Sequence, residues 1–247
     1  MITVSIVSHG HGEMVSRLIK QLEDCPEVTQ VILTRNIYEP LVQEQTGKLE
    51  IIVNNVPAGF AANHNAAFKR CREPYFCVVN PDITISEGLF RTLIACKEMN
   101  KAALAAPMVL SPGGILEDSV RRFPTFLSLV SKAFRGPDGR YLFTKSDAPF
   151  FPESVAGMFM LFDSFAYKYI KGFDEHYYMY YEDIDICVRL WKADLKIVVC
   201  PQASVTHAAR RDSHRKGRFL LWHLSSMAKY FYRYGFRQPK IGLSSGN

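Results

Sequence analysis

Short apolar runs alternate with helical patterns along the first half of the chain. The runs are rich in β-branched residues and bounded by turn residues, which is typical of strands; they cover 2–8, 28–34, 49–55 and 75–80. Segments with helical spacing of apolar positions stand between them, at 12–24, 60–71 and 86–99. This alternation predicts an α/β domain whose mostly parallel, Rossmann-like sheet is flanked by helices on both faces.

The second half is less regular. Residues 102–110 predict one more strand, whereas 111–153 are rich in Pro, Gly and aromatic residues and show no clean period. A long irregular segment inside a compact domain is more often functional than filler. Beyond it, the pattern predicts a strand at 154–162, a short helix at 164–172 and a strand at 196–200.

Three carboxylates interrupt an apolar context in HYYMYYEDIDICVRLW, residues 176–191. A helix that begins near Glu182 would place four apolar side chains on one face: Ile184, Cys187, Val188 and Trp191. Asp185 and Arg189 would then form an ion pair between successive turns. Glu182 and Asp183 would lie in the first turn, where the helix dipole favours anions. The dipole accounts for one acid there, but less well for two in succession. A carboxylate held among aromatic side chains at a sheet edge can also accept a proton from a bound hydroxyl.

A second polar pair follows the strand at 75–80. In VVNPDI, Asn80 and Asp82 flank Pro81, which fixes the turn so that both side chains can point beyond the carboxyl ends of the strands. Oxygen ligands at such a place suit Mg²⁺ or Mn²⁺ bridging a diphosphate. The alternative is structural, because Asn-Pro-Asp is also a common turn.

Composition limits the class of protein. The chain has 247 residues, of which 48% are hydrophobic, enough for a sizeable core. No apolar run approaches the roughly 20 residues of a spanning helix, and the N-terminus lacks the features of a signal peptide. The six cysteines show no CxxC pair, so we expect reduced packing residues of a cytosolic protein. The net charge of +6 is concentrated in 208–247, where nine Lys and Arg face Asp212 alone.

Several segments together resemble a known family. SIVSHG, VPAGFAANHN, VVNPDI and the run from Gly157 to His207 occur in the order and spacing of family 2 glycosyltransferases with the GT-A fold. The chain is particularly similar to bacterial rhamnosyltransferases of O-antigen and related polysaccharide assembly, over roughly residues 2–235. The resemblance implies a GT-A catalytic domain at 1–207 and a basic, aromatic and partly helical C-terminal extension at 208–247. Within the catalytic domain it implies a nucleotide-sugar-binding half, 1–110, and an acceptor and catalytic half, 111–207.

By that resemblance, Asn80 and Asp82 form the DxD-type element, with Asp82 binding a divalent cation (Mg²⁺ or Mn²⁺) and the donor diphosphate. Asp183 takes the place of the catalytic base in the family's ED motif, and its neighbour Glu182 shapes the acceptor site. His207 stands where some relatives place a further metal ligand; the alternative is a histidine satisfied at a strand end.

The donor-binding residues that the resemblance implies are Ser8, Asn36, Gly59, Asn63, Asn65, Asn80 and Asp82. Gly59 would permit a close backbone approach to the nucleotide, although helix capping and packing explain Gly59, Asn63 and Asn65 equally well. Relatives usually carry Asp-Asn after the second strand, where the acid accepts a hydrogen bond from the pyrimidine. Here Arg35 precedes Asn36, and an arginine cannot accept that bond. Base recognition would then use Asn36, a backbone carbonyl or another acid.

On the acceptor side, Arg121 and Arg122 offer cations for a diphosphate, and Tyr181 together with Phe123 and Tyr141 offers rings for a sugar face. A solvated loop with incidental charge is the alternative for the two arginines.

These features predict a metal-dependent inverting hexosyltransferase, most specifically one that moves L-rhamnose from dTDP-L-rhamnose to a polyprenyl-diphosphate-linked or saccharide acceptor. A catalytically silent nucleotide-sugar-binding protein would share the fold. The pI near 9.0 raises a nucleic-acid-binding protein as a second rival, but the charge does not spread over the domain. Instead the basic segment interleaves cations with aromatic residues, which favours peripheral attachment to an anionic membrane surface, on the cytoplasmic face of the bacterial inner membrane.

Overall fold

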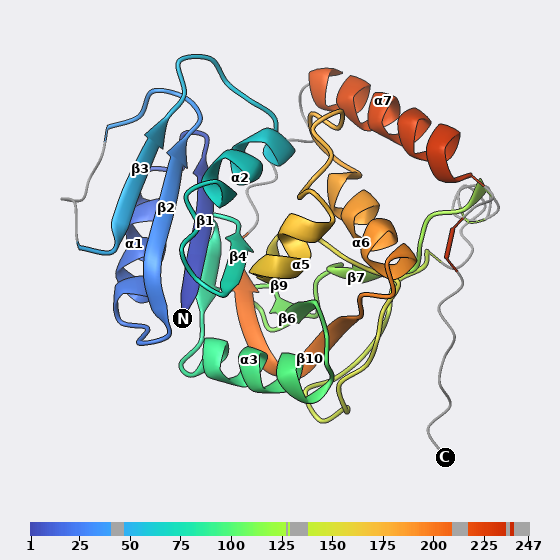
Figure 1. Ribbon diagram of the computed structural model, residues 1–247, viewed down its shortest axis with the longest axis horizontal. Coiled ribbons are helices and arrows are strands. Elements are labelled where there is room, and N and C mark those ends of the chain that lie inside the picture. Colours follow the sequence, from blue (N-terminus) through green and yellow to red (C-terminus); the bar gives the residue numbers. More distant parts are fainter. Residues whose placement is uncertain (41–46, 127, 129–137, 209–216, 236–237, 240–247) are drawn as a thin grey trace.

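The computed structural model describes residues 1–40, 47–126, 128, 138–208, 217–235 and 238–239 (Figure 1). The strands are β1 (Ile2–Ser8), β2 (Val28–Arg35), β3 (Leu49–Val53), β4 (Tyr75–Val79), β5 (Ile83–Ile85), β6 (Leu104–Leu110), β7 (Val120–Arg121), β8 (Ser154–Val155), β9 (Phe159–Asp163) and β10 (Ile197–His207). The helices are α1 (Glu13–Glu23), α2 (Phe60–Phe68), α3 (Leu89–Met99), α5 (Ser164–Tyr169), α6 (Glu182–Lys192) and α7 (Gly217–Tyr234). The helix predicted to begin near Glu182 begins at that residue.

Eight of the described strands form one sheet, in the order β3-β2-β1-β4-β9-β6-β10-β5. β1 runs parallel to β2 and β4, β2 parallel to β3, and β6 parallel to β10. β9 is antiparallel to its neighbours β4 and β6, and β5 is antiparallel to β10. The mostly parallel sheet is confirmed; the antiparallel strands are an addition that alternating patterns do not reveal.

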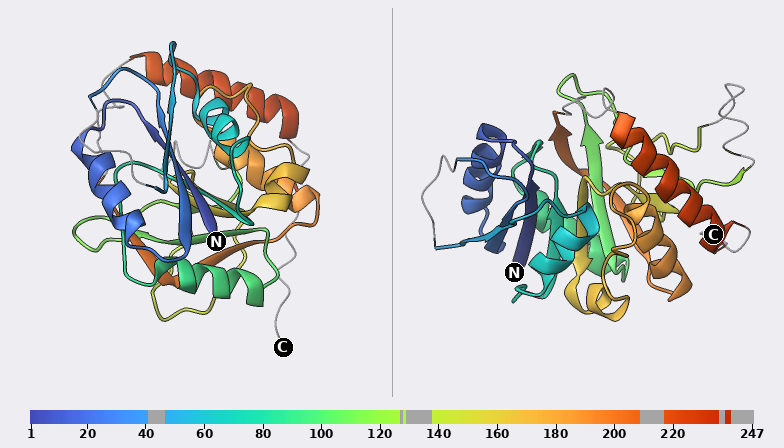
Figure 2. Two further views of the ribbon diagram at one scale, coloured as in Figure 1. Left: turned by 60° about the vertical axis from the view of Figure 1, so that its left-hand side comes forward. Right: turned by 90° about the horizontal axis from the view of Figure 1, so that it is seen from above.

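Helices cover both faces of this sheet (Figure 2). α1 and α3 pack on one face; Val15, Leu18, Ile19 and Leu22 of α1 recur at helical spacing and are buried in that core. α2, α5 and α6 pack on the other face, and α7 joins the same core through Tyr230 and Tyr234. The helix predicted in the C-terminal extension is therefore present, and part of it packs on the rest of the protein.

Two strand predictions need correction. The apolar run 154–162 forms β8 and β9 with a turn between them, because the backbone around Gly157 meets α6 instead of continuing the ladder. β10 continues past the predicted end at Cys200 as far as His207. Its register against β6 shifts between Cys200 and Ser204. Such a bulge accommodates Pro201, a residue that normally argues against a continuing strand.

The cysteine prediction is wrong for one pair. A disulfide joins Cys96 on α3 to Cys200 on β10, whereas Cys25, Cys71, Cys77 and Cys187 are free. The two bonded residues are 104 positions apart in the sequence, so no short spacing marks them. They meet because α3 packs on β10. No helix within the described ranges combines the length and apolarity that crossing a membrane requires.

Candidate active site

The first part of the site lies at the edge of the sheet where the parallel strands end. Ser8 is the last residue of β1, Asn36 follows β2, and Asn80 follows β4. The registers that pair Ser8 with Arg35 and Ile6 with Val79 bring these ends to one edge. Crevices at the carboxyl ends of strands are where open α/β sheets bind ligands. Three of the predicted donor-side residues, Ser8, Asn36 and Asn80, are thus brought to a single edge.

Asn36 and Asn63 hold a loop in place at this edge. The buried Asn36 side chain donates to the Ala58 carbonyl (3.0 Å) and accepts from the Ala58 N–H (2.8 Å). Asn63 donates to the same carbonyl (3.1 Å), and both asparagines accept hydrogen bonds from the Asn54 amide (2.9 and 2.7 Å). These amides therefore shape the loop that would approach a nucleotide, and their own hydrogen-bonding groups are largely occupied.

Gly59 and Asn65 attach α2 to the segment before α6. A Cβ atom on Gly59 would lie 2.5 Å from the carbonyl oxygen of Tyr178, so only glycine permits this approach. The N–H of Phe60 donates to that same oxygen (3.0 Å). The Asn65 amide accepts from Tyr167 and from the Phe173 N–H, and donates to the Phe173 carbonyl and to Glu175. Packing between two segments accounts for the identity of both residues.

An acid and a histidine face each other where β5 meets β10. Strand pairing sets His207 opposite Ile83, and the Ala208 N–H donates to the Asp82 carbonyl (2.9 Å). The His207 Nε2 lies 3.3 Å from Asp82 Oδ2, and Nδ1 lies 3.7 Å from Glu117 Oε2. Burial is the largest single effect and disfavours the charged forms, but the mutual hydrogen bond and the neighbouring opposite charges together outweigh it, so the pKa of Asp82 is lowered and that of His207 is raised. Asp82 Oδ1 and His207 Nδ1 are buried without a hydrogen-bond partner.

The acid motif sits at a strained entry to α6. Tyr180 and Tyr181 both have left-handed backbone conformations (φ 69° and 67°), which non-glycine residues seldom adopt without functional or structural compensation. Burial and the neighbouring charge of Asp183 raise the pKa of Glu182 well above its usual range. Burial also raises the pKa of Asp183, although hydrogen bonds from the N–H groups of Gly157 and Ile184 and the charge of Arg121 act in the opposite direction.

A short backbone path joins the two acid sites. Asp183 Oδ2 accepts from the Gly157 N–H (3.1 Å), and the carbonyl of the next residue, Met158, accepts from the Asn80 N–H (2.9 Å). The antiparallel pairing of β4 with β9 produces this arrangement, because it places Val79 opposite Phe159. The backbone of Gly157 and Met158 therefore holds both the acid motif of α6 and the polar turn after β4.

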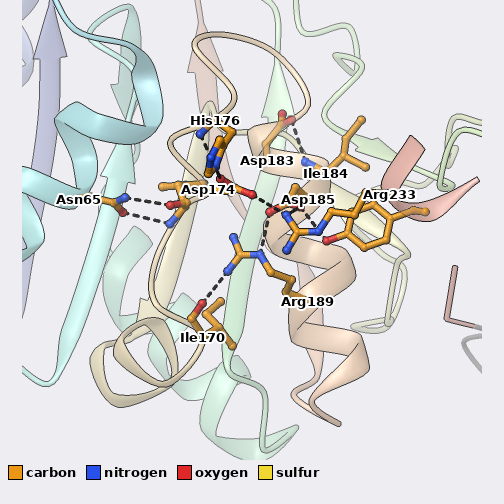
Figure 3. Close-up of polar contacts among 11 residues, drawn as sticks. Asn65, Ile170, Asp174, His176, Asp183, Ile184, Asp185, Arg189 and Arg233 are labelled. Carbon is orange, nitrogen blue, oxygen red and sulfur yellow. Dashed lines mark hydrogen bonds and ion pairs between the residues drawn. The ribbon is translucent and has the colours of Figure 1, made fainter. Parts of the chain in front are cut away.

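Asp185 serves a different purpose from its neighbours. Its fully buried carboxylate pairs with Arg189 Nε (2.7 Å) and accepts from the Tyr234 hydroxyl (2.7 Å) and from Arg233 (3.3 Å). Figure 3 shows Arg189 and Arg233 pointing toward Asp185, while the Asp183 carboxylate points away from them. The predicted ion pair is confirmed, and the same carboxylate anchors α7 to α6 through Tyr234 and Arg233.

Of the predicted acceptor-side residues, Arg121 and Tyr181 lie close to the acid motif, and both arginines have partners of their own. Arg121 pairs with Asp118 through two nitrogens. Its positive charge also acts on Asp183, where it opposes the rise in pKa. Arg122 lies over the ring of Tyr141, 5.7 Å from its centroid. Tyr181 is buried, and burial followed by the charge of Asp183 raises its pKa.

Two acids in this region carry no signal in the sequence. Glu117 lies in the irregular segment, far from His207 in the sequence, and folding brings the two side chains together. Glu39 is buried, accepts from the Gly12 N–H (3.2 Å) through Oε2, and keeps Oε1 without a hydrogen-bond partner. Arg35, which stands where relatives usually carry an Asp, donates a hydrogen bond to the backbone carbonyl of Glu39. Within the described ranges, no cluster of three or more His, Cys, Asp and Glu side chains could hold a metal ion.

The sheet order, the covering helices and the acids at the strand ends define a GT-A fold of the glycosyltransferase type. GalNAc-T7, solved with UDP, GalNAc and Mn²⁺, superimposes with a TM-score of 0.70 at 13% identity, over 86% of this chain and 44% of that one. TarS of S. aureus, in complex with UDP-GlcNAc, gives a TM-score of 0.59 at 11% identity, over 85% of this chain and 59% of that one. At such identities the likeness shows the fold alone, and the chain spans about half the length of these proteins.

Sequence similarity is more specific, although no family model matches the chain. Rhamnosyltransferase WbbL of Escherichia coli K12 is 27% identical over 251 residues, 94% of this chain and 93% of the relative. N-acetylglucosaminyl-diphospho-decaprenol L-rhamnosyltransferase of Mycobacterium tuberculosis is 28% identical over 169 residues, 65% of this chain and 54% of the relative. The predicted resemblance is confirmed: the chain resembles bacterial family 2 rhamnosyltransferases, and the comparisons support a glycosyltransferase.

Proposed function

We propose that the protein is an inverting glycosyltransferase that moves L-rhamnose from dTDP-L-rhamnose to a polyprenyl-diphosphate-linked or saccharide acceptor in the synthesis of a cell-surface polysaccharide such as O-antigen. One observation carries the proposal: a partly buried carboxylate, Asp183, is held by the backbone of Gly157 beside the turn that bears Asn80 and Asp82. Support for the sugar comes from the two rhamnosyltransferase relatives, one of them named for a decaprenol-linked substrate.

Asp183 acts as general base in this proposal. It accepts the proton of an acceptor hydroxyl, whose oxygen forms a bond to the anomeric carbon from the face opposite the leaving group. The bond from that carbon to the nucleoside diphosphate breaks, and its electron pair leaves with the phosphate oxygen. A single displacement inverts the anomeric configuration. Glu182, which burial keeps protonated over a wider pH range than usual, borders the acceptor site without serving as a second base.

Asp82 and His207 are the residues that would hold a divalent cation. Their fit rests on chemistry: Asp82 Oδ1 is a buried oxygen without a hydrogen-bond partner, and its carboxylate lies beside an imidazole. Mg²⁺ commonly takes one or two protein ligands and completes its shell with phosphate oxygens and water. When bound, a cation of this kind supplies positive charge against which the leaving diphosphate is stabilised. GalNAc-T7, which shares the fold, has been solved with Mn²⁺.

The donor's base would be recognised near β1 and β2. Ser8, Asn36, Gly59, Asn63 and Asn65 belong to the predicted donor side, but the contacts described above assign the three asparagines mainly to shaping it. Arg35 cannot accept a hydrogen bond from the base, but the buried Oε1 of Glu39 can. A pyrimidine N3–H is a suitable donor for that oxygen.

The acceptor would lie on the side of Arg121, Arg122 and Tyr181. A lipid-linked acceptor stays in the bilayer, so the proposal includes peripheral attachment to the cytoplasmic face of the bacterial inner membrane. The domain division at residue 207 remains part of the same proposal. Arg211, Arg215 and Lys216, cations of the predicted extension, lie outside the described residues.

Turnover of defined substrates tests the function. The purified protein, with Mg²⁺ or Mn²⁺, should release dTDP from dTDP-L-rhamnose only when a polyprenyl-diphosphate N-acetylglucosamine acceptor is present, and should form a rhamnosylated lipid. Asp183→Asn should lose the product while still binding donor. Donor binding without turnover on any acceptor tried would instead favour a catalytically silent nucleotide-sugar-binding protein.

A further inference from the structure

α7 presents two different faces, one of which is fixed to the segment that leads into the acid motif. Ser226 donates to the Met179 carbonyl (2.9 Å), and Lys229 donates to the His176 carbonyl (2.6 Å). The rings of Trp222 and Tyr178 are 4.7 Å apart. Further along, Tyr230 packs on Tyr181 and Arg233 pairs with Asp174. The inward face of α7 therefore braces residues 174–181, directly before Glu182.

The opposite face of α7 is apolar and exposed. Its large side chains are Leu220, Leu221, Leu224 and Tyr232, exposed by 61%, 68%, 45% and 97%. At 100° per residue Leu221, Leu224 and Tyr232 fall on the side of the helix away from the buried Ser226, Tyr230 and Tyr234, and Leu220 lies at the border of that side. Exposed apolar residues are unremarkable one at a time, but a contiguous set on one helix face marks an interaction surface.

Cations border this face. Arg218, Lys229 and Arg233 are separated by eleven and four residues, which is three turns and one turn, so they line up along one flank of α7. Lys229 and Arg233 direct their head groups to the His176 carbonyl and to Asp174 and Asp185, so the cationic character of this flank rests on Arg218 and on the net charge of the segment. No Asp or Glu lies between Gly217 and Tyr234, and the whole segment 208–247 contains nine Lys and Arg against one Asp. An apolar stripe with a cationic flank is the composition of a helix that lies in the interface of an anionic membrane. A protein partner would not require the excess of positive charge.

We infer that the outward face of α7, formed by Leu220, Leu221, Leu224 and Tyr232, docks on an anionic lipid leaflet. The inference rests on the proposed function for its purpose: because the inward face braces residues 174–181, a leaflet seated on α7 lies about one helix diameter, roughly 10 Å, from the segment that leads into the acid motif. An acceptor anchored in that leaflet would then need to expose only its sugar and diphosphate to reach the site.

Sedimentation with vesicles tests the surface without any sugar, so the result does not depend on the proposed chemistry. The full chain should bind phosphatidylcholine vesicles that contain phosphatidylglycerol, and binding should weaken as salt rises. The double variant Leu221→Ser/Leu224→Ser should bind at least about tenfold more weakly, because both side chains leave water on docking. Met99→Ser is the matched control: Met99 is 80% exposed at the end of α3, a helix that lies across the molecule from α7 in Figure 1 and in the left-hand view of Figure 2.

Three results would overturn the inference. The wild-type protein fails to bind these vesicles; the double variant binds as well as the wild type; or the wild type self-associates through this face, so that the double variant becomes monomeric and neither protein binds lipid. Transfer to a water-soluble acceptor separates this inference from the proposed function. An unchanged rate in the double variant, together with lost vesicle binding, supports the surface, whereas equal loss of transfer to soluble and lipid acceptors would assign the face to the fold.

Discussion

The carboxylate of Asp183 accepts a hydrogen bond from the backbone N–H of Gly157, at 3.1 Å. A side chain at position 157 would crowd this contact, since a Cβ there would lie 3.0 Å from the ring of Phe60 and 3.7 Å from Cβ of Asp183. The bond favours the ionised carboxylate and so opposes the effect of burial. The hydrogen bond from Gly157 therefore keeps this carboxylate ionised down to a lower pH than burial alone would allow, which suits the general-base role proposed for Asp183.

Replacing Asp183 by Asn should lower the rate of sugar transfer by on the order of 10²-fold or more, because the shape remains and the base is lost. Donor affinity, measured by the shift in thermal unfolding with dTDP-L-rhamnose, should stay near that of the wild type. Glu13→Gln, a change at an exposed acid on α1, is the control and should leave both measurements unchanged. Near-normal transfer by the Asp183 variant would exclude this residue as the base.

The pH dependence of kcat should show the raised pKa of Asp183. Since the folded protein raises this pKa, protonation begins at a higher pH than the ordinary value of about 3.9, and activity should fall as the pH drops through the raised value. Arg121→Gln should move this acid limb further upward, because the positive charge that favours the carboxylate is removed. An acid limb that stays in place in the Arg121 variant would show that this charge does not act on the base.

Asp82→Ala should abolish the dependence of donor binding on Mg²⁺ or Mn²⁺, and His207→Ala should raise the cation concentration required. The measurement is thermal unfolding with donor over a titration of the cation, which reports binding without turnover. Asp138→Ala removes an acid of the surface that pairs with Arg140, and should have no effect on the titration. Donor binding and transfer that are insensitive to EDTA in the wild type would contradict a metal role for both residues.

Gly59→Ala should destabilise the protein by about 1–3 kcal/mol or more, because the new methyl group meets a backbone carbonyl that cannot rotate away. The cost arises at Tyr178, whose oxygen would lie 2.5 Å from the added carbon. Urea unfolding checks it, with Gly113→Ala as control, since a Cβ there has its nearest neighbour at 3.8 Å. If both variants unfold alike, close packing is not what requires glycine at position 59.

Local patterns predicted the elements well and the contacts between distant segments poorly. The start of α6 at Glu182 and the Asp185–Arg189 pair follow from helical spacing within one segment, so they could be predicted. Glu117 beside His207, and the disulfide, depend on which strands become neighbours in the sheet. A carboxylate in an irregular segment has no periodicity to mark it. Tertiary register therefore decides these features, and register is not visible in a single sequence.

The buried pair of Ser5 and His64 should make stability depend on pH. Ser5 Oγ and His64 Nδ1 are 2.8 Å apart, and burial lowers the pKa of His64 to about 3. The unfolded chain binds a proton at this residue near pH 6.5, whereas the folded protein does so only near pH 3. The free energy of unfolding should therefore fall as the pH drops from about 6.5 toward 3, by ~2 kcal/mol at pH 5. Urea unfolding of the wild type and of His64→Gln at pH 7 and pH 5 isolates this contribution, because other groups such as Glu182, whose raised pKa acts in the opposite direction, are common to both proteins. Equal losses of stability in the two proteins between these pH values would mean that His64 is not the group responsible.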